Sequence, residues 1–466
     1  MERNLTLTCL SSLAYTNDEQ NLRITAEIIR GKLMIIRRDK YLKKLIDKRG
    51  NGLVKIITGI RRSGKSFLLF NLFHEYLNSI GVPDENIIEL SLDEALNARY
   101  RNPLELDKYI RDRITDSSRQ YYVFLDEIQK VSDIQNPYIE DKSAKIGFID
   151  VLLGLMKIRN ADIYVTGSNS KMLSSDILTE FRGRGDEIRV SPLTYEEFLS
   201  AYVGEQRLAW EEYCTYGGMP FAISLKTHEE KSKYLKDLCD KTYIDDVLER
   251  HKITNDRSVL SSLLDITASS VGSLTNPSKL SNTFRSEAKV QISPNTIGRY
   301  LDFFIDAFIM RSARRYDVKG KKYINSLEKF YFIDIGLRNA RLNFRQQEEN
   351  HIMENIIFNE LMSREFNVDI GMVEYNHLDA LGKKVRTQLE IDFVANKGSV
   401  RYYIQSAFSI RDDAKRRQET NSLVRVPDSF KKIVVVKDPI IPWHDEKGIL
   451  YVGIERFLLD ESAMEL

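Results

Sequence analysis

A glycine-rich stretch near the start of the chain has the residue types and the spacing that bind phosphate. Residues 59–66 read G-x-x-x-x-G-K-S and stand between two apolar runs, residues 54–58 and a second run that begins at Phe67. Glycine lets main-chain N–H groups approach phosphate oxygens, and the start of the following helix adds a partial positive charge. We expect Lys65 to reach the β- and γ-phosphates and Ser66 to ligate Mg²⁺.

This stretch predicts a strand, a phosphate-binding loop and a helix that together hold a nucleoside triphosphate. No N-K-x-D motif, which reads guanine, stands in the expected place, but this alone does not distinguish ATP from GTP. The residues of the loop expected to contact the nucleotide are Gly59, Ile60, Arg61, Arg62, Ser63, Gly64, Lys65, Ser66 and Phe67.

Two adjacent acids supply the second part of this expected site. Residues 121–125, YYVFL, form an apolar run that ends at Asp126 and Glu127. In P-loop ATPases an acid at this strand end completes the shell of Mg²⁺, and a neighbouring glutamate polarises the attacking water. We therefore predict that Asp126 ligates the metal together with Ser66. Glu127 and Lys65 are the expected catalytic residues.

A later strand adds polar residues to the same edge. Residues 161–170, ADIYVTGSNS, read as a strand whose end carries Thr166, Ser168 and Asn169. Side chains at this place would lie beside the γ-phosphate and could report its presence, although hydroxyl and amide residues also end ordinary strands. Ser168 and Asn169 are the two that we expect to contact the nucleotide.

An arginine-containing turn follows. Arg182 and Arg184 stand in a glycine-containing turn, where a guanidinium could reach a phosphate across a subunit boundary as an arginine finger. Arg184 is the candidate for this catalytic role. The alternative is a salt bridge with Glu180 or Asp186.

Length and composition limit the classes of protein. A chain of 466 residues is too long for one core and predicts about three domains. The formal net charge of +1 gives no global attraction to nucleic acid or to an anionic membrane, so such binding needs a local patch. The three cysteines lie far apart, which fits a reducing cytosol, and no apolar run is long enough to span a membrane. We expect a cytoplasmic protein. The cysteines are Cys9, Cys214 and Cys239.

The front half alternates between strand-like and helix-like segments. Helical patterns over residues 67–80, 102–119 and 147–159 separate apolar runs at 54–58, 86–92, 121–125 and 161–166. Alternation of this kind predicts an α/β fold with a parallel sheet.

Several stretches together resemble one family: GIRRSGKS, FLDE, VTGSNS, RGRGDEIRVSPLTYEEF, YGGMPFAI and YINSLEKFYFIDIGLRNA. The chain resembles the bacterial and archaeal AAA-type P-loop ATPases that carry a C-terminal domain of unknown function (DUF4143). The resemblance runs from about Met34 to the end of the chain. It implies a parallel sheet of the AAA type, a helical lid, a winged-helix module and a restriction-nuclease-like α/β domain.

The expected domain boundaries follow from these stretches. They are a leader or flexible arm at 1–33, the ATPase core at 34–203, a helical lid or linker at 204–255, a winged-helix module at 256–345 and the nuclease-like domain at 346–466. The winged-helix reading rests on three short helical patterns and a basic hairpin at 311–323. Such a module contacts DNA or serves only for protein docking. The cations expected on the hairpin are Arg311, Arg314, Arg315, Lys319, Lys321 and Lys322.

The last domain looks like the PD-D/E-x-K nuclease frame, in which acids hold Mg²⁺ and a lysine steadies the attacking hydroxide. Glu354 and Asp392 match the frame, with Glu390 close by, but Gln405 stands at an acid position and Ala407 at the lysine position. We expect a catalytically degenerate site that lacks its cationic group, unless a migrated lysine such as Lys415 replaces it.

Three functions remain open. The first is Mg²⁺-dependent ATP hydrolysis coupled to movement of the rear half, with DNA or a protein as possible partner, no membrane contact and an oligomer possible. The second is a nucleotide-gated binding module for DNA or protein with little turnover. The third is an ATP-regulated DNA endonuclease.

Overall fold

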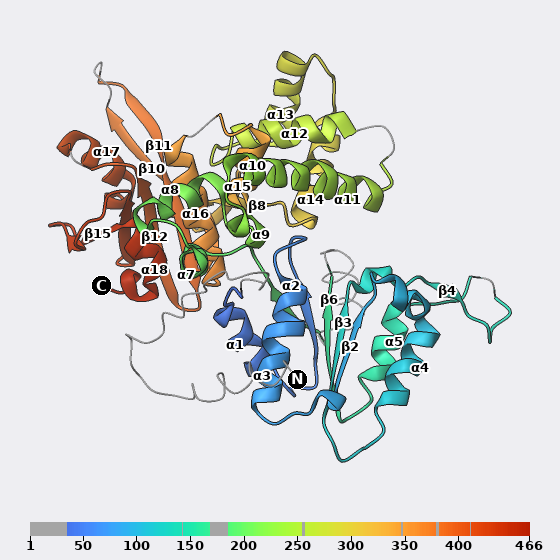
Figure 1. The fold of residues 1–466 in the computed structure, drawn as a ribbon. Helices are drawn as coiled ribbons and strands as arrows, with labels where there is room; N and C mark the ends of the chain where they lie inside the picture. Colours follow the sequence, from blue (N-terminus) through green and yellow to red (C-terminus); the bar gives the residue numbers. More distant parts are fainter. Residues whose placement is uncertain are drawn as a thin grey trace. The chain divides into compact units, whose positions relative to one another are not determined.

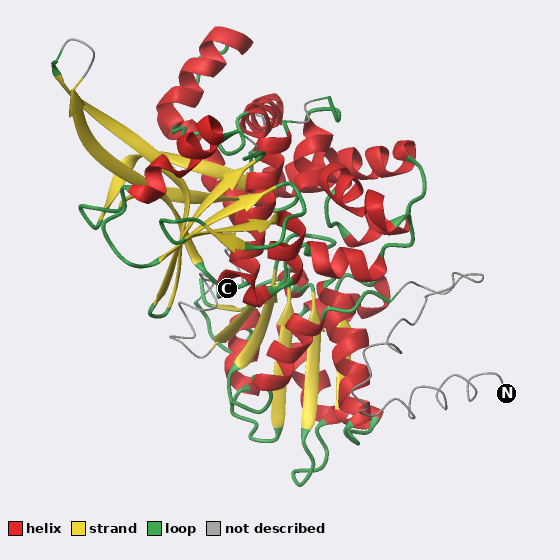
Figure 2. Ribbon diagram, turned by 90° about the vertical axis from the view of Figure 1, so that its left-hand side faces the viewer, coloured by secondary structure: helices red, strands yellow, loops and turns green. Residues whose placement is uncertain are grey.

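The structure is a computed structural model that divides into two compact units, Met1–Ile36 and Arg37–Leu466. Every element discussed below belongs to the second unit. Figures 1 and 2 show its helices and strands. The residues that the structure describes are 35–141, 143–167, 185–253, 257–345, 348–378, 382–410 and 412–466.

The front half contains a five-stranded parallel sheet in the order β2-β3-β6-β1-β7. This confirms the predicted α/β fold. β1 and β3 are buried along their whole length because parallel strands are covered on both faces, which explains their unbroken apolar sequences. The strands are β1 (Val54–Thr58), β2 (Ile87–Ser91), β3 (Tyr121–Asp126), β6 (Ala161–Thr166) and β7 (Gly185–Arg189).

Helices cover both faces of this sheet (Figure 1). On one face lie α1 (Asp39–Asp47) and a helical segment made of α2 (Lys65–Phe67), a π-helical turn and α3 (His74–Ser79). On the other lie α4 (Pro103–Arg113) and α5 (Phe148–Leu155). A small hairpin, β4 (Ile134–Gln135) and β5 (Lys145–Ile146), precedes α5. The layers place the β1–α2 connection at the carboxyl edge of the sheet.

A group of helices follows the sheet. They are α7 (Tyr195–Ala201), α8 (Ala209–Tyr216), α9 (Pro220–Ser224), α10 (His228–Asp237), a π-helical turn (Leu238–Tyr243) and α11 (Ile244–Arg250). Next come α12 (Arg257–Ser269), α13 (Pro277–Thr283), a second π-helical turn (Phe284–Ala288) and α14 (Pro294–Asp306). Ser293 caps α14 by accepting a hydrogen bond from the Thr296 N–H, 3.1 Å away.

The YGGMP and IDIGLRNA stretches pack against each other. A Cβ at Gly336 would lie 1.9 Å from the carbonyl oxygen of Tyr216, so only glycine fits there. The Gly218 N–H donates to the Asp334 carboxylate at 2.6 Å, and burial raises the pKa of Asp334 to about 6. These residues join α8 to α15 (Ile335–Arg341), which accounts for both stretches as packing signals.

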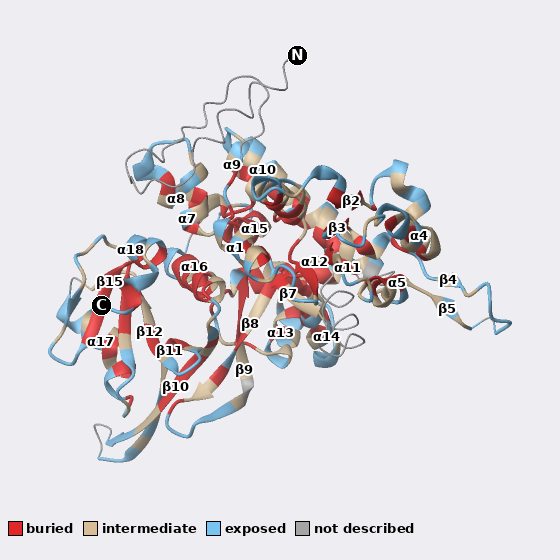
Figure 3. Cartoon of the chain, turned by 90° about the horizontal axis from the view of Figure 1, so that it is seen from below, coloured by how far each residue is buried: buried red, intermediate tan, exposed pale blue. Residues whose placement is uncertain are grey.

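The back half contains an eight-stranded mixed sheet in the order β14-β15-β13-β12-β11-β10-β8-β9. Its helices are α16 (Glu349–Ser363), α17 (Asp413–Val424) and α18 (Ile454–Leu459), and α16 is buried along most of its length (Figure 3). The strands are β8 (Met310–Asp317), β9 (Lys322–Phe332), β10 (Asn367–Leu378), β11 (Lys384–Lys397), β12 (Val400–Ala407), β13 (Lys431–Val436), β14 (Trp443–His444) and β15 (Ile449–Gly453).

The eight-stranded sheet has strands on both sides of the expected boundary between 345 and 346. The expected wing hairpin is β8–β9, and β8 pairs in parallel with β10, so one sheet runs across the boundary. Two of the hairpin's expected free cations are also engaged. Arg315 is buried and donates to Gln388 at 3.1 Å, and Arg311 is half-buried and donates to the Ser191 hydroxyl at 3.3 Å. Local patterning reveals a hairpin, but the strand beside it is decided by distant sequence.

Among the residues described, none of the helices combines the length and the apolar character that crossing a bilayer requires.

Candidate nucleotide-binding site

The loop between β1 and α2 has a backbone that two glycines make possible. Gly59 has φ 138°, and a Cβ there would lie 2.1 Å from the Val190 carbonyl oxygen. Gly64, which precedes α2, has φ 93°. Both values lie in the region that L side chains rarely adopt, so the glycines of the motif are required by the turn itself.

Lys65 lies inside this loop. Its side chain is buried, and Nζ donates to the carbonyl oxygens of Gly59 and Ile60, each at 3.1 Å. Burial lowers the pKa of Lys65 to about 8, against the opposing effect of Glu127 and Asp126. A phosphate at this place would compete with two neutral carbonyls for the ammonium group and would restore the preference of the lysine for its charged form.

The ends of β3 and β6 bring three polar side chains together. Thr166 Oγ1 donates to Asp126 Oδ1, and the Glu127 N–H points at the same hydroxyl from 3.4 Å. Burial raises the pKa of Glu127, while Lys65 acts in the opposite direction. The Glu127 carboxylate also accepts a hydrogen bond from the Gln129 side chain. The two acids thus lie next to Lys65, as the carboxyl ends of parallel strands require.

These residues fit a metal-bound triphosphate. The Ser63 hydroxyl is buried and is among the side-chain atoms without a hydrogen-bond partner in the described part of the chain. An orphaned donor beside a buried ammonium suits phosphate oxygens. Ser66 and Asp126 carry the hydroxyl and carboxylate oxygens that Mg²⁺ prefers.

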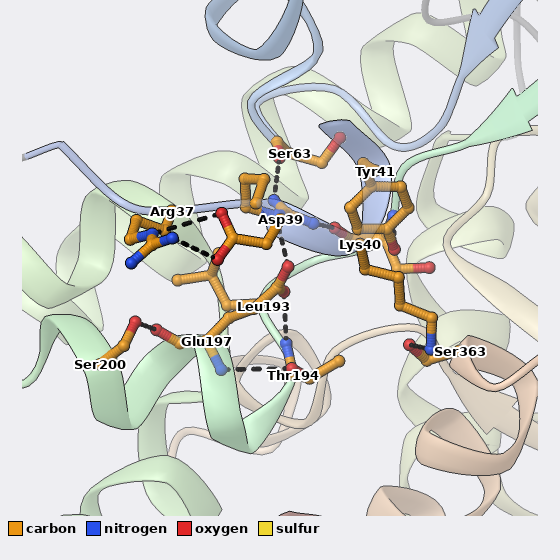
Figure 4. Close-up of polar contacts among 12 residues, drawn as sticks. Arg37, Asp39, Lys40, Tyr41, Ser63, Leu193, Thr194, Glu197, Ser200 and Ser363 are labelled. Carbon is orange, nitrogen blue, oxygen red and sulfur yellow. Dashed lines mark hydrogen bonds and ion pairs between the residues drawn. The ribbon is translucent and has the colours of Figure 1, made fainter. Parts of the chain in front are cut away.

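Arg38, which lies outside the G-x-x-x-x-G-K-S motif, holds the phosphate loop in place. Arg38 is buried and donates to the Ser63 carbonyl at 3.0 Å, to the Ser191 carbonyl at 2.7 Å and to Glu197 Oε1 at 2.9 Å. Glu197 is itself fixed in a capping box with Thr194, which begins α7 (Figure 4). The SPLTYEEF stretch therefore supplies an anchor for the phosphate loop, which motif reasoning did not reveal.

A second contact reaches the loop from the helical segment at 238–250. Arg61 donates to Asp246 Oδ1 at 2.7 Å, and the buried Tyr243 hydroxyl donates to the Arg61 carbonyl at 3.0 Å. Neither partner belongs to a recognisable motif, and both lie more than 180 positions along the chain from Arg61. The structure alone identifies them.

Three expected site residues, Ser168, Asn169 and Arg184, lie outside the described residues, as does Arg182. The alternative partner for the arginines, Asp186, lies in β7, where it accepts hydrogen bonds from Lys48 and from Asn51.

The second expected site, in the back half, is assembled in part. Glu354 of α16 meets Glu390 and Asp392 of β11 around one lysine, Lys329 of β9. Lys329 places a cationic group in this cluster from a position that the expected frame does not include. Gln405 donates to Asp392 at 2.8 Å, Ala407 is part of the hydrophobic core, and Lys415 lies exposed on α17.

Comparison with known families and proteins agrees with the front-half geometry. Residues 51–199 match the family described as an AAA domain. Residues 207–348 match a domain of unknown function, DUF8612, which differs from the C-terminal domain expected from the resemblance. That match also crosses the expected boundary between the lid and the winged-helix module.

Two curated relatives extend over most of the chain. An uncharacterized protein of Haemophilus influenzae is 32% identical over 406 residues, which cover 86% of this chain and 93% of that protein. An uncharacterized protein of Methanocaldococcus jannaschii is 27% identical over 447 residues, covering 92% and 89%. Among solved structures, the Walker-type ATPase of Pyrococcus abyssi aligns at 14% identity with a TM-score of 0.45, over 66% of this chain and 96% of that chain.

Proposed function

This chain belongs to the family of the Haemophilus influenzae relative, and from that premise we propose that it is a Mg²⁺-dependent ATPase. The observation that supports the proposal most is the position of Lys65. Its buried ammonium group is held by loop carbonyls and faces Asp126 and Glu127. The AAA domain at residues 51–199 supports the same reading.

Each residue then has a role in the reaction. The main-chain N–H groups of residues 59–66 bind the phosphate oxygens, and Lys65 neutralises charge that develops on the γ-phosphate. Ser66 and Asp126 would hold Mg²⁺, which when bound neutralises the phosphates and fixes their orientation. Thr166 orients Asp126 through its hydrogen bond. Glu127 polarises the attacking water and accepts its proton.

Residues outside the described part of the chain keep their proposed roles. Ser168 and Asn169 contact the γ-phosphate, and Arg184 acts as an arginine finger in an oligomer. For the domains we propose an ATPase core at 34–203, followed by the helical part. The nuclease-like domain takes in β8 and β9 and so begins at 310 rather than at 346.

The ATPase proposal is tested by phosphate release with purified full-length protein. We expect Lys65→Ala to abolish ATP binding. Glu127→Gln should keep binding and lower turnover by about 10²-fold or more, because it removes the proton acceptor. Two matched controls on exposed helix positions, Lys43→Ala and Glu75→Gln, should leave both quantities unchanged. A wild-type protein with no turnover, with or without DNA, would refute the ATPase.

A second candidate is a nucleotide-gated binding module with little turnover. It is favoured by the Gln129 side chain, which donates to Glu127 Oε2, one of the two carboxylate oxygens that could otherwise accept a hydrogen bond from the attacking water. We propose that the partner of this module binds to the helices α13 and α14. There an open hollow of about 620 Å³ lies between α13 and α14 and is lined by Asn276, Asn295 and Arg299. DNA and protein are the candidate partners.

Removing the Gln129 side chain separates the two candidates. If the module reading holds, wild-type turnover lies near background, and Gln129→Ala raises it several-fold. Gln135→Ala, an exposed control in β4, should have no effect. A gel-shift panel with DNA, RNA or no nucleic acid, each with and without ATP, then shows whether Glu127→Gln and Arg299→Ala change partner affinity. Efficient wild-type turnover would remove this candidate.

A further inference from the structure

The back-half carboxylate cluster is built around a buried lysine that belongs to none of the expected nuclease positions. Lys329 comes from β9, Glu354 from α16, and Glu390 and Asp392 from β11, so three separate elements meet there. We propose that the Lys329 ammonium group is the permanent cation of this centre, in the place where a metal-dependent nuclease holds a divalent ion. The proposal concerns the back half and stands independently of the ATPase.

Distances support the ammonium as the central cation. Lys329 Nζ lies 2.8 Å from Glu354 Oε1, 2.6 Å from Glu390 Oε1 and 3.9 Å from Asp392 Oδ1. The lysine is only 3% exposed, so solvent does little to screen these contacts. A divalent ion placed among the same three oxygens would overlap the ammonium group or lie against a like charge.

Protein groups also occupy part of the remaining carboxylate capacity. The Tyr331 hydroxyl donates to Glu354 Oε1 at 2.6 Å. The Gln405 side chain and the Ser406 N–H both donate to Asp392 Oδ2 at 2.8 Å. Mg²⁺ requires an octahedral set of oxygens. Within the described ranges, no group of three or more His, Cys, Asp or Glu residues is arranged to hold a metal ion. The residues present therefore do not fit the metal that the fold resemblance implies.

The pKa shifts of these groups also support the ammonium group as the central cation. Burial acts to lower the pKa of Lys329, but Glu354, Asp392 and Glu390 outweigh it and raise the value, so the lysine stays charged. Burial acts to raise the pKa of Glu354, yet Lys329 and the surrounding hydrogen bonds hold it below its usual value. Burial and the Glu354 charge raise the pKa of Asp392 well above normal. One ammonium thus balances one negative charge of the cluster, and the raised pKa of Asp392 reduces the charge that remains.

The cluster holds three elements of the back half together without a metal ion. Lys329 ties β9 to α16 and β11, and β9 leads through Asp334 into α15, which packs against α8. Without a divalent ion the centre cannot generate a metal-bound hydroxide. We expect the back half to bind a partner or to pass on conformational changes. We do not expect it to cut nucleic acid.

The test is the response of thermal stability to a divalent ion in nucleotide-free protein. Wild-type Tm should be the same with and without millimolar MnCl₂. Lys329→Ala leaves three carboxylates facing one another, so its Tm should fall, and Mn²⁺ should restore several degrees of it by binding the native state. The matched control is Lys55→Ala, which removes another buried lysine but exposes only the single carboxylate of Asp162 to the vacated space. Mn²⁺ should not rescue that variant.

If Lys329→Ala fails to fold, the double variant Lys329→Ala/Asp392→Asn removes one of the three carboxyl groups as well and should fold and respond to Mn²⁺. Two results would overturn the proposal. One is a wild-type Tm that rises with Mn²⁺ while that of Lys329→Ala does not. The other is cleavage of supercoiled plasmid by wild-type protein with Mg²⁺ or Mn²⁺ that disappears in Lys329→Ala, since Lys329 would then be a catalytic lysine beside a metal.

Discussion

The Arg38 side chain uses its guanidinium to join three segments that are far apart along the chain. It reaches the carbonyl of Ser63 in the phosphate loop, the carbonyl of Ser191 and the carboxylate of Glu197. A guanidinium presents its donors in a fixed plane, so it can hold several acceptors in one geometry, whereas a lysine ammonium cannot. Arg38 is therefore a positioning residue for the loop and not a group that touches the nucleotide.

Replacing Arg38 should change ATP binding without changing the chemical step. We expect Arg38→Lys to raise KM for ATP about tenfold while kcat changes little, because the loop loses a fixed partner, whereas Glu127 and Asp126 stay in place. Steady-state kinetics at several ATP concentrations separates the two constants. Arg37→Lys is the control, since Arg37 is exposed and pairs with Asp39, two positions further along the chain. Equal effects of both substitutions would contradict the positioning role.

At the scale of elements, α11 and the π-helical turn before it connect the phosphate loop to the helical part. Asp246 and Tyr243 contact Arg61, while Asp240 and Cys239 on the same turn contact α15. The turn thus has one side on the loop and the other on the stretch that continues from β9. A shift of the phosphate loop on nucleotide binding would be transmitted to α15 through the contacts of this segment.

Asp246 is the negative charge that this segment places beside the loop. Asp246→Asn should tighten ATP binding about fivefold, roughly 1 kcal/mol for a partly exposed charge, because it removes repulsion and frees Arg61 for phosphate. Calorimetric titration with ATP measures the change. Asp245→Asn, also in α11 but paired with Arg257, should leave affinity unchanged. Weaker binding in Asp246→Asn would mean instead that the ion pair holds the loop in its binding form.

At the scale of the whole molecule, contacts within the second unit join the ATPase front to the back half. α1 begins just after Arg38, and its Lys40 donates to the Ser363 hydroxyl at 3.3 Å, while its Lys44 pairs with Glu365 (Figure 4 shows the first contact). The same short helix therefore adjoins the loop anchor and the end of α16. Together with α11, it provides two routes by which the state of the loop can reach the back half.

The phosphate loop could be predicted from sequence because its geometry is local. Eight consecutive residues contain the two left-handed glycine positions, the lysine and the hydroxyl, and the apolar run before them specifies the strand. The acids Asp126 and Glu127 followed from a general rule, since parallel strands bring their carboxyl ends to one edge. Local pattern and fold class were sufficient for this part of the site.

Only the tertiary structure placed Arg38, Asp246 and Lys329. Arg38 and Asp246 come from segments that carry no motif. Lys329 lies in a stretch that the family resemblance uses, but nothing in the neighbouring residues indicates its partners. The same holds for β8 and β9, whose alternating pattern specifies a hairpin but not the sheet that it joins. A sequence motif consists of residues that lie close along the chain and act in the same site. A buried charge meets its counter-charge only when distant segments pack, and this packing made Lys329 the cation of the rear cluster.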